Sequence, residues 1–119
     1  MHDGPIVLFA GGGTGGHLYP ALALAEELER RRPDVHSFFV GAQGGLEAYV
    51  LPKRGVDHEL LPVRGFQRGE LWSNLGVPAA LVKSFTKALG VHRRLRPELV
   101  VVTGGYAGAP AGLVAALLR

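Results

Sequence analysis

Residues 12–17, with the sequence Gly-Gly-Thr-Gly-Gly-His, have the composition of a loop that binds an anionic group. Five of the six residues 11–16 are glycine, so the backbone can take positive φ and its amides can approach a ligand closely. The apolar residues 6–10 before the loop predict a strand, and Pro20 after it predicts the first turn of a helix. Unpaired N–H groups and a positive dipole end there favour a phosphate or pyrophosphate. The alternative is a tight turn that packs a helix on a strand.

Two better-known phosphate-binding loops fit the sequence less well. Gly11, Gly13 and Gly16 satisfy the dinucleotide pattern G-x-G-x-x-G, but that pattern also needs an acid after the second strand, where residues 38–43 read Phe-Phe-Val-Gly-Ala-Gln. A P-loop needs Lys followed by Ser or Thr, whereas the chain has His17 and Leu18. The sequence therefore argues against a nucleotide-dependent oxidoreductase and against an NTPase.

Composition narrows the remaining function classes. The 119 residues suffice for one domain, and the absence of cysteine removes disulfide and thiolate chemistry. The five histidines lack the spacing of metal ligands, so no metal is expected. The net charge is only +3, and the arginines of residues 30–32 and 93–96 lie at expected helix C-termini without interleaved aromatics, so no nucleic acid is expected. No signal peptide or membrane-spanning run is present in the sequence.

Apolar strands and helical segments alternate along the chain. Strands are expected at residues 6–10, 35–40, 58–63 and 99–102, and helices at 20–31, 46–54 and 78–95. The first helix should bury Ala21, Leu24, Ala25 and Leu28. This alternation predicts an α/β fold with a doubly wound, mostly parallel sheet.

Residues 103–110 repeat the opening pattern, because a second glycine-rich loop joins an apolar strand to a helix with proline near its start. In the common doubly wound orders the first and fourth strands are neighbours, so both loops should line one crevice at the carboxyl ends of the strands. Residues 112–119 are apolar nearly all round and predict a helix covered on more than one side. A helix of this kind leads into another strand, which predicts that the chain is part of a longer protein.

Together these segments resemble one family. Residues 12–23 and 103–110 are similar to the two glycine loops of the bacterial peptidoglycan N-acetylglucosaminyltransferases of the MurG type, and Glu47, residues 51–56 and residues 63–66 match the family's spacing. The resemblance covers essentially all 119 residues. It implies a Rossmann-like, acceptor-binding N-terminal domain, residues 1–119, of a two-domain GT-B glycosyltransferase. The C-terminal donor domain, absent from this chain, would act in cis or in trans.

The resemblance also implies an activity and two substrates. The family transfers N-acetylglucosamine from UDP-N-acetylglucosamine to the muramoyl O4 of undecaprenyl-pyrophosphoryl-muramoyl-pentapeptide, with inversion and without a metal or other cofactor. It works as a peripheral protein on the cytoplasmic face of the bacterial inner membrane. The alternative function is a non-catalytic, membrane-recruiting half of a split lipid-linked sugar transferase, and a histidine at position 17 favours the catalytic one.

Roles of individual residues follow from the same resemblance. His17 matches the histidine beside the reacting hydroxyl, where the positive end of a helix dipole would favour a neutral base. The residues assigned to the donor and its phosphates are Gly13, Thr14, Gly15 and Gly16. The residues assigned to the acceptor pyrophosphate are Gly104, Gly105 and Tyr106. Tyr106 could equally stack on a sugar or close its loop.

A further segment combines apolar and basic residues as membrane-surface sites do. The predicted patch consists of Phe66, Arg68, Leu71, Trp72 and Leu75, with Arg64, Lys83 and Lys87 nearby. Apolar side chains flanked by bases favour an anionic bilayer surface. The alternative is an ordinary core helix with a solvated basic face.

Overall fold

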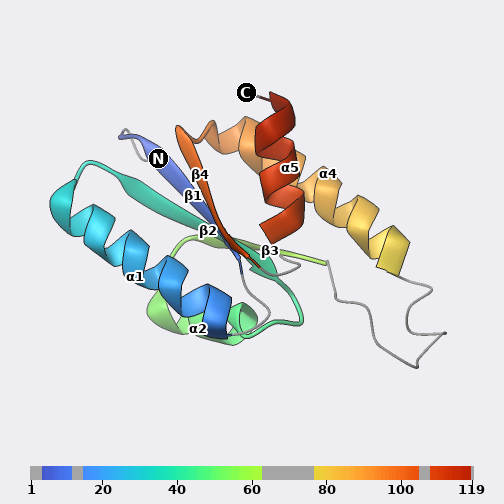
Figure 1. The fold of residues 1–119 in the computed structure, drawn as a ribbon, viewed down its shortest axis with the longest axis horizontal. Helices are drawn as coiled ribbons and strands as arrows, with labels where there is room; N and C mark the ends of the chain where they lie inside the picture. The colour runs from blue at the N-terminus through green and yellow to red at the C-terminus, as the bar shows by residue number, and fades with distance from the viewer. Residues whose placement is uncertain (1–3, 12–14, 63–76, 105–107, 119) are drawn as a thin grey trace.

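The computed structural model describes residues 4–11, 15–62, 77–104 and 108–118 (Figure 1). Its strands are β1 (Ile6–Gly11), β2 (His36–Ala42), β3 (His58–Leu61) and β4 (Leu99–Gly104). Its helices are α1 (Gly15–Arg31), α2 (Glu47–Arg54), α4 (Val77–Leu95) and α5 (Gly108–Leu118). The predicted alternation of strands and helices is confirmed.

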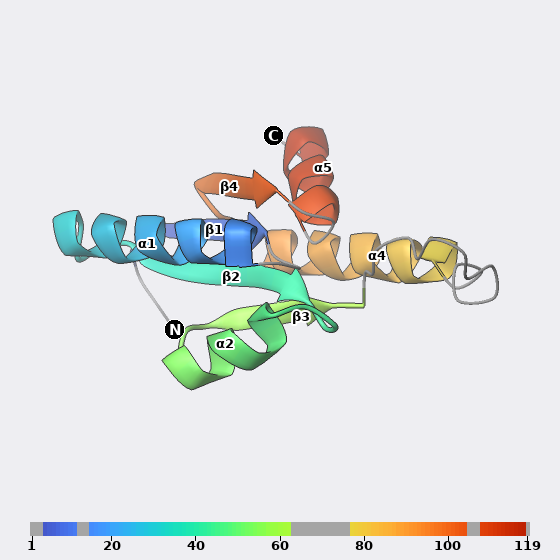
Figure 2. The same cartoon turned by 60° about the horizontal axis from the view of Figure 1, so that its bottom comes forward.

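The four strands form one sheet in the order β3-β2-β1-β4, and every pair is parallel (Figure 2). Phe9 of β1 is paired with Phe39 of β2 on one side and with Val101 of β4 on the other. The winding of the chain thus reverses at β1, which makes the first and fourth strands neighbours as the sequence predicts. Their carboxyl ends meet at one edge of the sheet.

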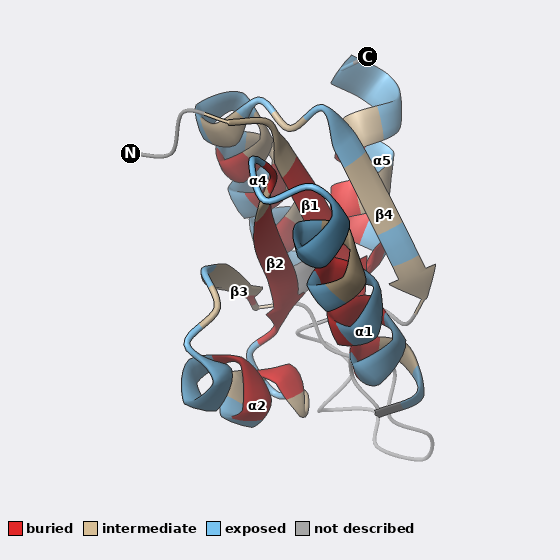
Figure 3. Cartoon of the chain, turned by 90° about the vertical axis from the view of Figure 1, so that its left-hand side faces the viewer, coloured by how far each residue is buried: buried red, intermediate tan, exposed pale blue. Residues whose placement is uncertain are grey.

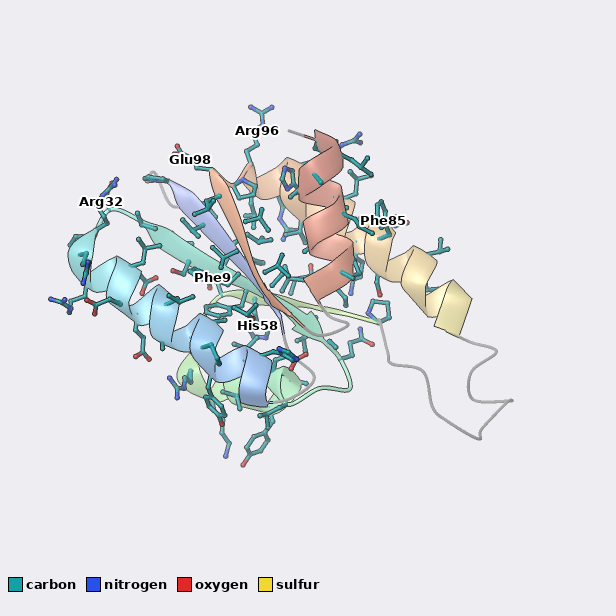
Figure 4. The ribbon with its side chains drawn as sticks, in the orientation of Figure 1. Phe9, Arg32, His58, Phe85, Arg96 and Glu98 are labelled. Atoms are coloured by element: carbon teal, nitrogen blue, oxygen red, sulfur yellow. The ribbon has the colours of Figure 1, made fainter. Side chains whose placement is uncertain are left out.

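Helices cover both faces of the sheet (Figure 1). On one face, Val7, Phe9 and Phe39 pack with apolar residues of α1 and α2. The rings of Phe9 and Phe39 stack with centroids 5.3 Å apart, and Phe9 points from β1 toward the α1 side (Figure 4). Residues in alternate positions face the other way: Leu8 and Ala10 pack with α4 and α5. The result is a three-layer α/β/α arrangement with two hydrophobic layers.

The inner and outer strands differ sharply in burial (Figure 3). Every residue of β2 except His36 is buried, whereas in β4 Leu99 is 56% exposed and Val102 46% exposed. The described residues place no strand beside the outer edge of β4. Helix α5 buries Pro110, Ala111 and Val114 but leaves Leu113 and Leu117 exposed. Helix α5 thus packs against both α4 and β4, and its remaining face is exposed among the described residues.

Helix α1 begins at Gly15, five residues before the predicted start at Pro20. Pro20 lies inside the helix, where it has no N–H for the carbonyl of Gly16. The buried face includes Ala21 and Ala25 as expected, but Leu24 is 51% exposed, so its predicted burial is wrong. The added first turn brings Leu18 into the core, 1% exposed, and shifts the face that packs on the sheet.

The arginine clusters lie where the sequence places them. Arg30 and Arg31 are in the last turn of α1, and both contact Glu27; Arg93 and Arg94 are in the last turn of α4. Cations at these positions interact favourably with the negative end of the helix dipole. Of the helices within the described ranges, none has both the length and the apolar character needed to cross a membrane.

Candidate functional site

The carboxyl ends of β1 and β4 carry an irregularity in their pairing. Ala10 is paired with Val102, but Gly11 is paired with Gly104, so Thr103 is an extra residue on β4. An extra residue of this kind takes its backbone out of the regular ladder and redirects its polar groups. Helix α1 begins four residues after Gly11, beside this point.

Two reciprocal hydrogen bonds join Thr103 to the first turn of α1. The Thr103 hydroxyl donates to the carbonyl oxygen of His17 at 2.7 Å, and His17 Nδ1 lies 3.1 Å from the carbonyl oxygen of Thr103. Because a carbonyl oxygen can only accept, Nδ1 carries the proton in this bond. In the neutral imidazole Nε2 then keeps its lone pair and can accept a proton. The end of β4 therefore fixes both the position and the tautomer of a half-buried histidine.

Glycines make the close approach of these two segments possible. A Cβ on Gly11 would lie 2.1 Å from the Thr103 hydroxyl oxygen. Gly104 has a φ of 116°, and a Cβ there would lie 2.8 Å from His17 Nδ1. Side chains at either position would displace Thr103 or His17, and the backbone at Gly104 is one that other residues rarely adopt. Both glycines serve the His17–Thr103 contact itself.

Comparison with known proteins identifies the family of this chain. Residues 7–119 match the family model described as the glycosyltransferase family 28 N-terminal domain. The chain belongs to glycosyltransferase family 28. The resemblance expected from the two glycine loops is thereby confirmed.

Several relatives of this glycosyltransferase family 28 chain carry the same printed name. A Thermus thermophilus protein called UDP-N-acetylglucosamine–N-acetylmuramyl-(pentapeptide) pyrophosphoryl-undecaprenol N-acetylglucosamine transferase is 50% identical over 113 residues, which are 95% of this chain and 32% of that protein. A Desulforudis audaxviator protein of the same name is 44% identical over 93% of this chain and 30% of its own length. The chain thus spans about a third of the curated relatives it matches.

The fold is also that of a solved family 28 structure. The crystal structure of Acinetobacter baumannii MurG superposes with a TM-score of 0.78 at 27% sequence identity. The match covers 96% of this chain and 32% of that one. The Rossmann-like N-terminal fold expected from the sequence is confirmed.

The structure describes only some of the residues that the sequence predicts to bind ligands. His17, Gly15 and Gly16 form the first turn of α1, and Gly104 ends β4 beside His17. The other predicted glycine-loop residues, Gly13, Thr14, Gly105 and Tyr106, lie outside the described residues. So do the predicted membrane-patch residues Phe66, Arg68, Leu71, Trp72 and Leu75. In the described ranges, no three His, Asp or Glu side chains are grouped as metal ligands.

Two features of the site go beyond the sequence prediction. Thr103 was expected only as part of the second glycine loop, and nothing in the sequence signals the extra residue that aligns it with His17. Glu47, which matches the family's spacing, is fully buried and accepts the backbone N–H of Ala42 at 2.6 Å. Cβ atoms on Gly41 or Gly45 would lie 2.2 Å and 2.5 Å from Glu47 side-chain atoms, so this carboxylate organises the turn after β2.

Proposed function

We propose that the protein containing this chain transfers N-acetylglucosamine from UDP-N-acetylglucosamine to the muramoyl hydroxyl of undecaprenyl-pyrophosphoryl-muramoyl-pentapeptide, and that this chain supplies the acceptor side. The observation that carries the proposal is the pair of hydrogen bonds between His17 and Thr103 at the strand-order reversal. Ligands of doubly wound folds bind at this point, outside the carboxyl ends of the strands. The names of the curated relatives give the donor, the acceptor and the group transferred.

His17 is the general base in this proposal. With Nδ1–H donating to the Thr103 carbonyl, Nε2 accepts the proton of the acceptor O4 as this oxygen bonds to C1 of the donor sugar. The bond between C1 and the UDP oxygen breaks, UDP leaves with the electron pair, and C1 is inverted. Thr103 is a positioning residue, because it acts only through His17. No step in this scheme requires a metal or another cofactor.

The donor half of the cleft is supplied by a second domain, in cis or in trans. The chain spans about a third of its relatives' length, and the described residues leave the outer edge of β4 and Leu117 of α5 exposed. A transferase that closes its cleft from two sides needs both halves, so we expect the 119-residue chain to show no turnover alone. Added donor domain should restore turnover.

The acceptor site is proposed to face an anionic membrane, as a peripheral association with the cytoplasmic face of the bacterial inner membrane. Described α4 residues support this: Lys83 and Lys87 are exposed, and Val82 is 67% exposed beside them. They line an open groove together with Gln43, Pro62 and Thr86. Each lysine or arginine near an anionic surface contributes about 1 kcal/mol, so the patch predicted from Phe66 to Leu75 would add to a weak attachment.

The transfer is tested with the full-length protein, radiolabelled UDP-N-acetylglucosamine and the lipid-linked muramoyl-pentapeptide. A lipid-linked disaccharide with an inverted linkage is the expected product. UDP-glucose at equal concentration is the matched donor control. Binding to the lipid acceptor without any transfer would support the non-catalytic, membrane-recruiting half and overturn the proposal.

The membrane attachment has its own test, sedimentation with anionic vesicles at low salt and at about 0.5 M salt, where screening shortens the Debye length to roughly 4 Å. We expect binding at low salt that weakens but persists at high salt, because Trp72 and Leu75 would insert. The variant Arg68→Glu with Trp72→Ser should sediment less. Equal sedimentation of this variant would exclude the patch as the membrane site.

A further inference from the structure

The pairing of β1 with β2 stops before either strand ends. Its last pair is Ala10 and Val40. Strand β1 continues for one more residue beside β4, where Gly11 is paired with Gly104. Strand β2 continues to Ala42 beside β3. At the carboxyl edge the described residues therefore form two pairs of strands, β1 with β4 and β2 with β3.

The direction of the backbone groups shows what interrupts the pairing. The N–H of His36 donates to the carbonyl oxygen of Pro5, just before β1. Every second residue of a strand points its N–H the same way, so the N–H of Ala42 also faces β1. Continued pairing would give this N–H the carbonyl oxygen of Gly11. Glu47 Oε1 accepts it instead, at 2.6 Å. The carboxyl group of Glu47 thus takes the place of a β1 carbonyl.

The surroundings of Glu47 are shaped for this carboxyl group. Glu47 is fully buried and is the first residue of α2, where the positive end of the helix dipole favours a carboxylate. A Cβ would lie 2.2 Å from Glu47 Cγ at Gly41 and 2.5 Å from Oε1 at Gly45, so both glycines leave the space. An apolar side chain could fill this space without the cost of burying a carboxyl group. The acceptor oxygen is therefore what the position requires.

The end of β1 that Glu47 separates from β2 is the segment that meets the His17 site. The three atoms nearest to a Cβ on Gly11 all belong to Thr103 and Gly104 of β4. Thr103 in turn makes both hydrogen bonds with His17. Pairing of Gly11 with β2 would draw the end of β1 away from Thr103, and the contact with His17 would loosen.

We propose that Glu47 is a positioning residue for His17. By accepting the N–H of Ala42, it ends the pairing of β1 with β2 at the residue before Gly11, and Gly11 stays against Thr103. The contacts lead from α2 through the ends of β1 and β4 to the first turn of α1. The proposal rests on the proposed function, in which His17 is the general base.

Two substitutions in the full-length protein separate the acceptor oxygen from the volume of the side chain. Glu47→Met fills the space without an acceptor of this kind, whereas Glu47→Gln keeps an oxygen for the Ala42 N–H. We expect Glu47→Met to lower kcat by about 10- to 100-fold with a nearly unchanged donor KM, because His17 is displaced. Glu47→Gln should retain most of the kcat. In a His17→Ala background, Glu47→Met should lower kcat no further.

The matched control is Val50→Ala in the same helix. Val50 is 9% exposed and belongs to the hydrophobic layer under α2, so its truncation should lower the unfolding midpoint and leave kcat intact in the folded protein. Glu47→Asp, whose carboxyl group is one carbon further from the Ala42 N–H, should show the same fall in kcat and decides the question if Glu47→Met does not fold. A normal kcat in either folded variant, or an equal fall in Glu47→Gln, would overturn the proposal.

A spectroscopic measurement tests the positioning without the reaction. In full-length protein labelled with ¹⁵N-histidine, the His17 signals are those absent from His17→Ala. At about pH 8.5, where neutral imidazole dominates, they should report the Nδ1–H tautomer in the unchanged protein and in Glu47→Gln, and a mixture of tautomers in Glu47→Met. Unchanged His17 signals in Glu47→Met would overturn the proposal. Absence of transfer by the unchanged enzyme would instead refute the proposed function, and the His17 signals would still decide the positioning.

Discussion

The two glycine-rich turns of this protein connect strand to helix in the same way, yet they hold their helices by different means. In each, the helix begins four residues after the strand ends, from Gly11 to Gly15 and from Gly104 to Gly108. Helix α1 is held by two hydrogen bonds with Thr103, whereas the contacts seen for α5 in the described part of the chain are packing contacts. A Cβ on Gly108 would lie 2.7 Å from a methyl carbon of Val102.

Hydrogen bonding and packing constrain the two helices differently. Hydrogen bonds fix direction, so the first turn presents one imidazole in one orientation and one tautomer. Close packing fixes only how near α5 approaches the sheet. Substitutions at Gly104, beside His17, and at Gly108, beside Val102, should therefore separate effects on catalysis from effects on stability alone.

The largest effect should come from His17→Ala in the full-length enzyme. Loss of a positioned general base lowers kcat by about 10²–10⁴, with little change in the donor KM. The matched control is His58→Ala, since His58 Nδ1 also lies 2.8 Å from a backbone carbonyl oxygen, that of Val56, but at the start of β3. Steady-state kinetics of both variants, compared with the unchanged enzyme, measure kcat and the donor KM. A near-normal kcat for His17→Ala would leave this histidine a structural role only.

Gly104→Ala should have the second-largest effect on kcat, because it both strains the backbone and displaces His17. A side chain at a φ of 116° costs about 1–3 kcal/mol of stability. The new Cβ would lie 2.8 Å from His17 Nδ1, and a base displaced by about 1 Å loses about 10²-fold in rate. Thermal unfolding and kcat should therefore fall together. Loss of stability with an intact kcat would contradict the coupling.

Gly108→Ala should affect stability alone, because a Cβ at Gly108 would meet Val102 and not His17. Contact with Val102 costs about 1–3 kcal/mol in a packed core. The control is Gly90→Ala in α4, where a Cβ meets nothing within 4 Å and the better helix former should add about 0.5–1 kcal/mol. Denaturant unfolding measures both changes. A marked fall in kcat for Gly108→Ala, at a temperature where it is folded, would show that Gly108 is not limited to packing.

Thr103→Val should have a smaller effect on stability than either Gly104→Ala or Gly108→Ala. It removes the hydroxyl that donates to the His17 carbonyl but keeps the Thr103 carbonyl that accepts from Nδ1. We expect a loss of about 1 kcal/mol in unfolding free energy and a modest fall in kcat with an unchanged KM. A change in KM alone would show that Thr103 contacts substrate instead of positioning His17.

Much of the fold could be predicted, because apolar runs separated by helical segments leave few topologies open. The strand positions, the neighbouring first and fourth strands and the family follow from residues 6–10, 99–102 and the two glycine loops. The start of α1 could not be predicted, since Pro20 marks a first turn locally while tertiary packing of Leu18 extends the helix to Gly15. The same extension displaces Leu24 from the buried face.

The candidate site was predicted in its residue types but not in its contacts. His17 and Gly104 are visible in the sequence as members of two loops. The bond between His17 and Thr103 depends on one unpaired residue at the end of β4, which is a property of strand register. The carboxylate of Glu47 is likewise explained only by the space that Gly41 and Gly45 leave for it.

The open edge of β4 has a consequence for handling the protein. Residues 99–103 read Leu-Val-Val-Val-Thr, a short uncharged run of high β-propensity without proline, and nothing in the described residues covers its outer side. Such an edge can add strands from other molecules and seed fibrils. The 119-residue chain should therefore be purified at low concentration, and Leu99→Lys, at a position that is 56% exposed, should oppose intermolecular pairing at this edge.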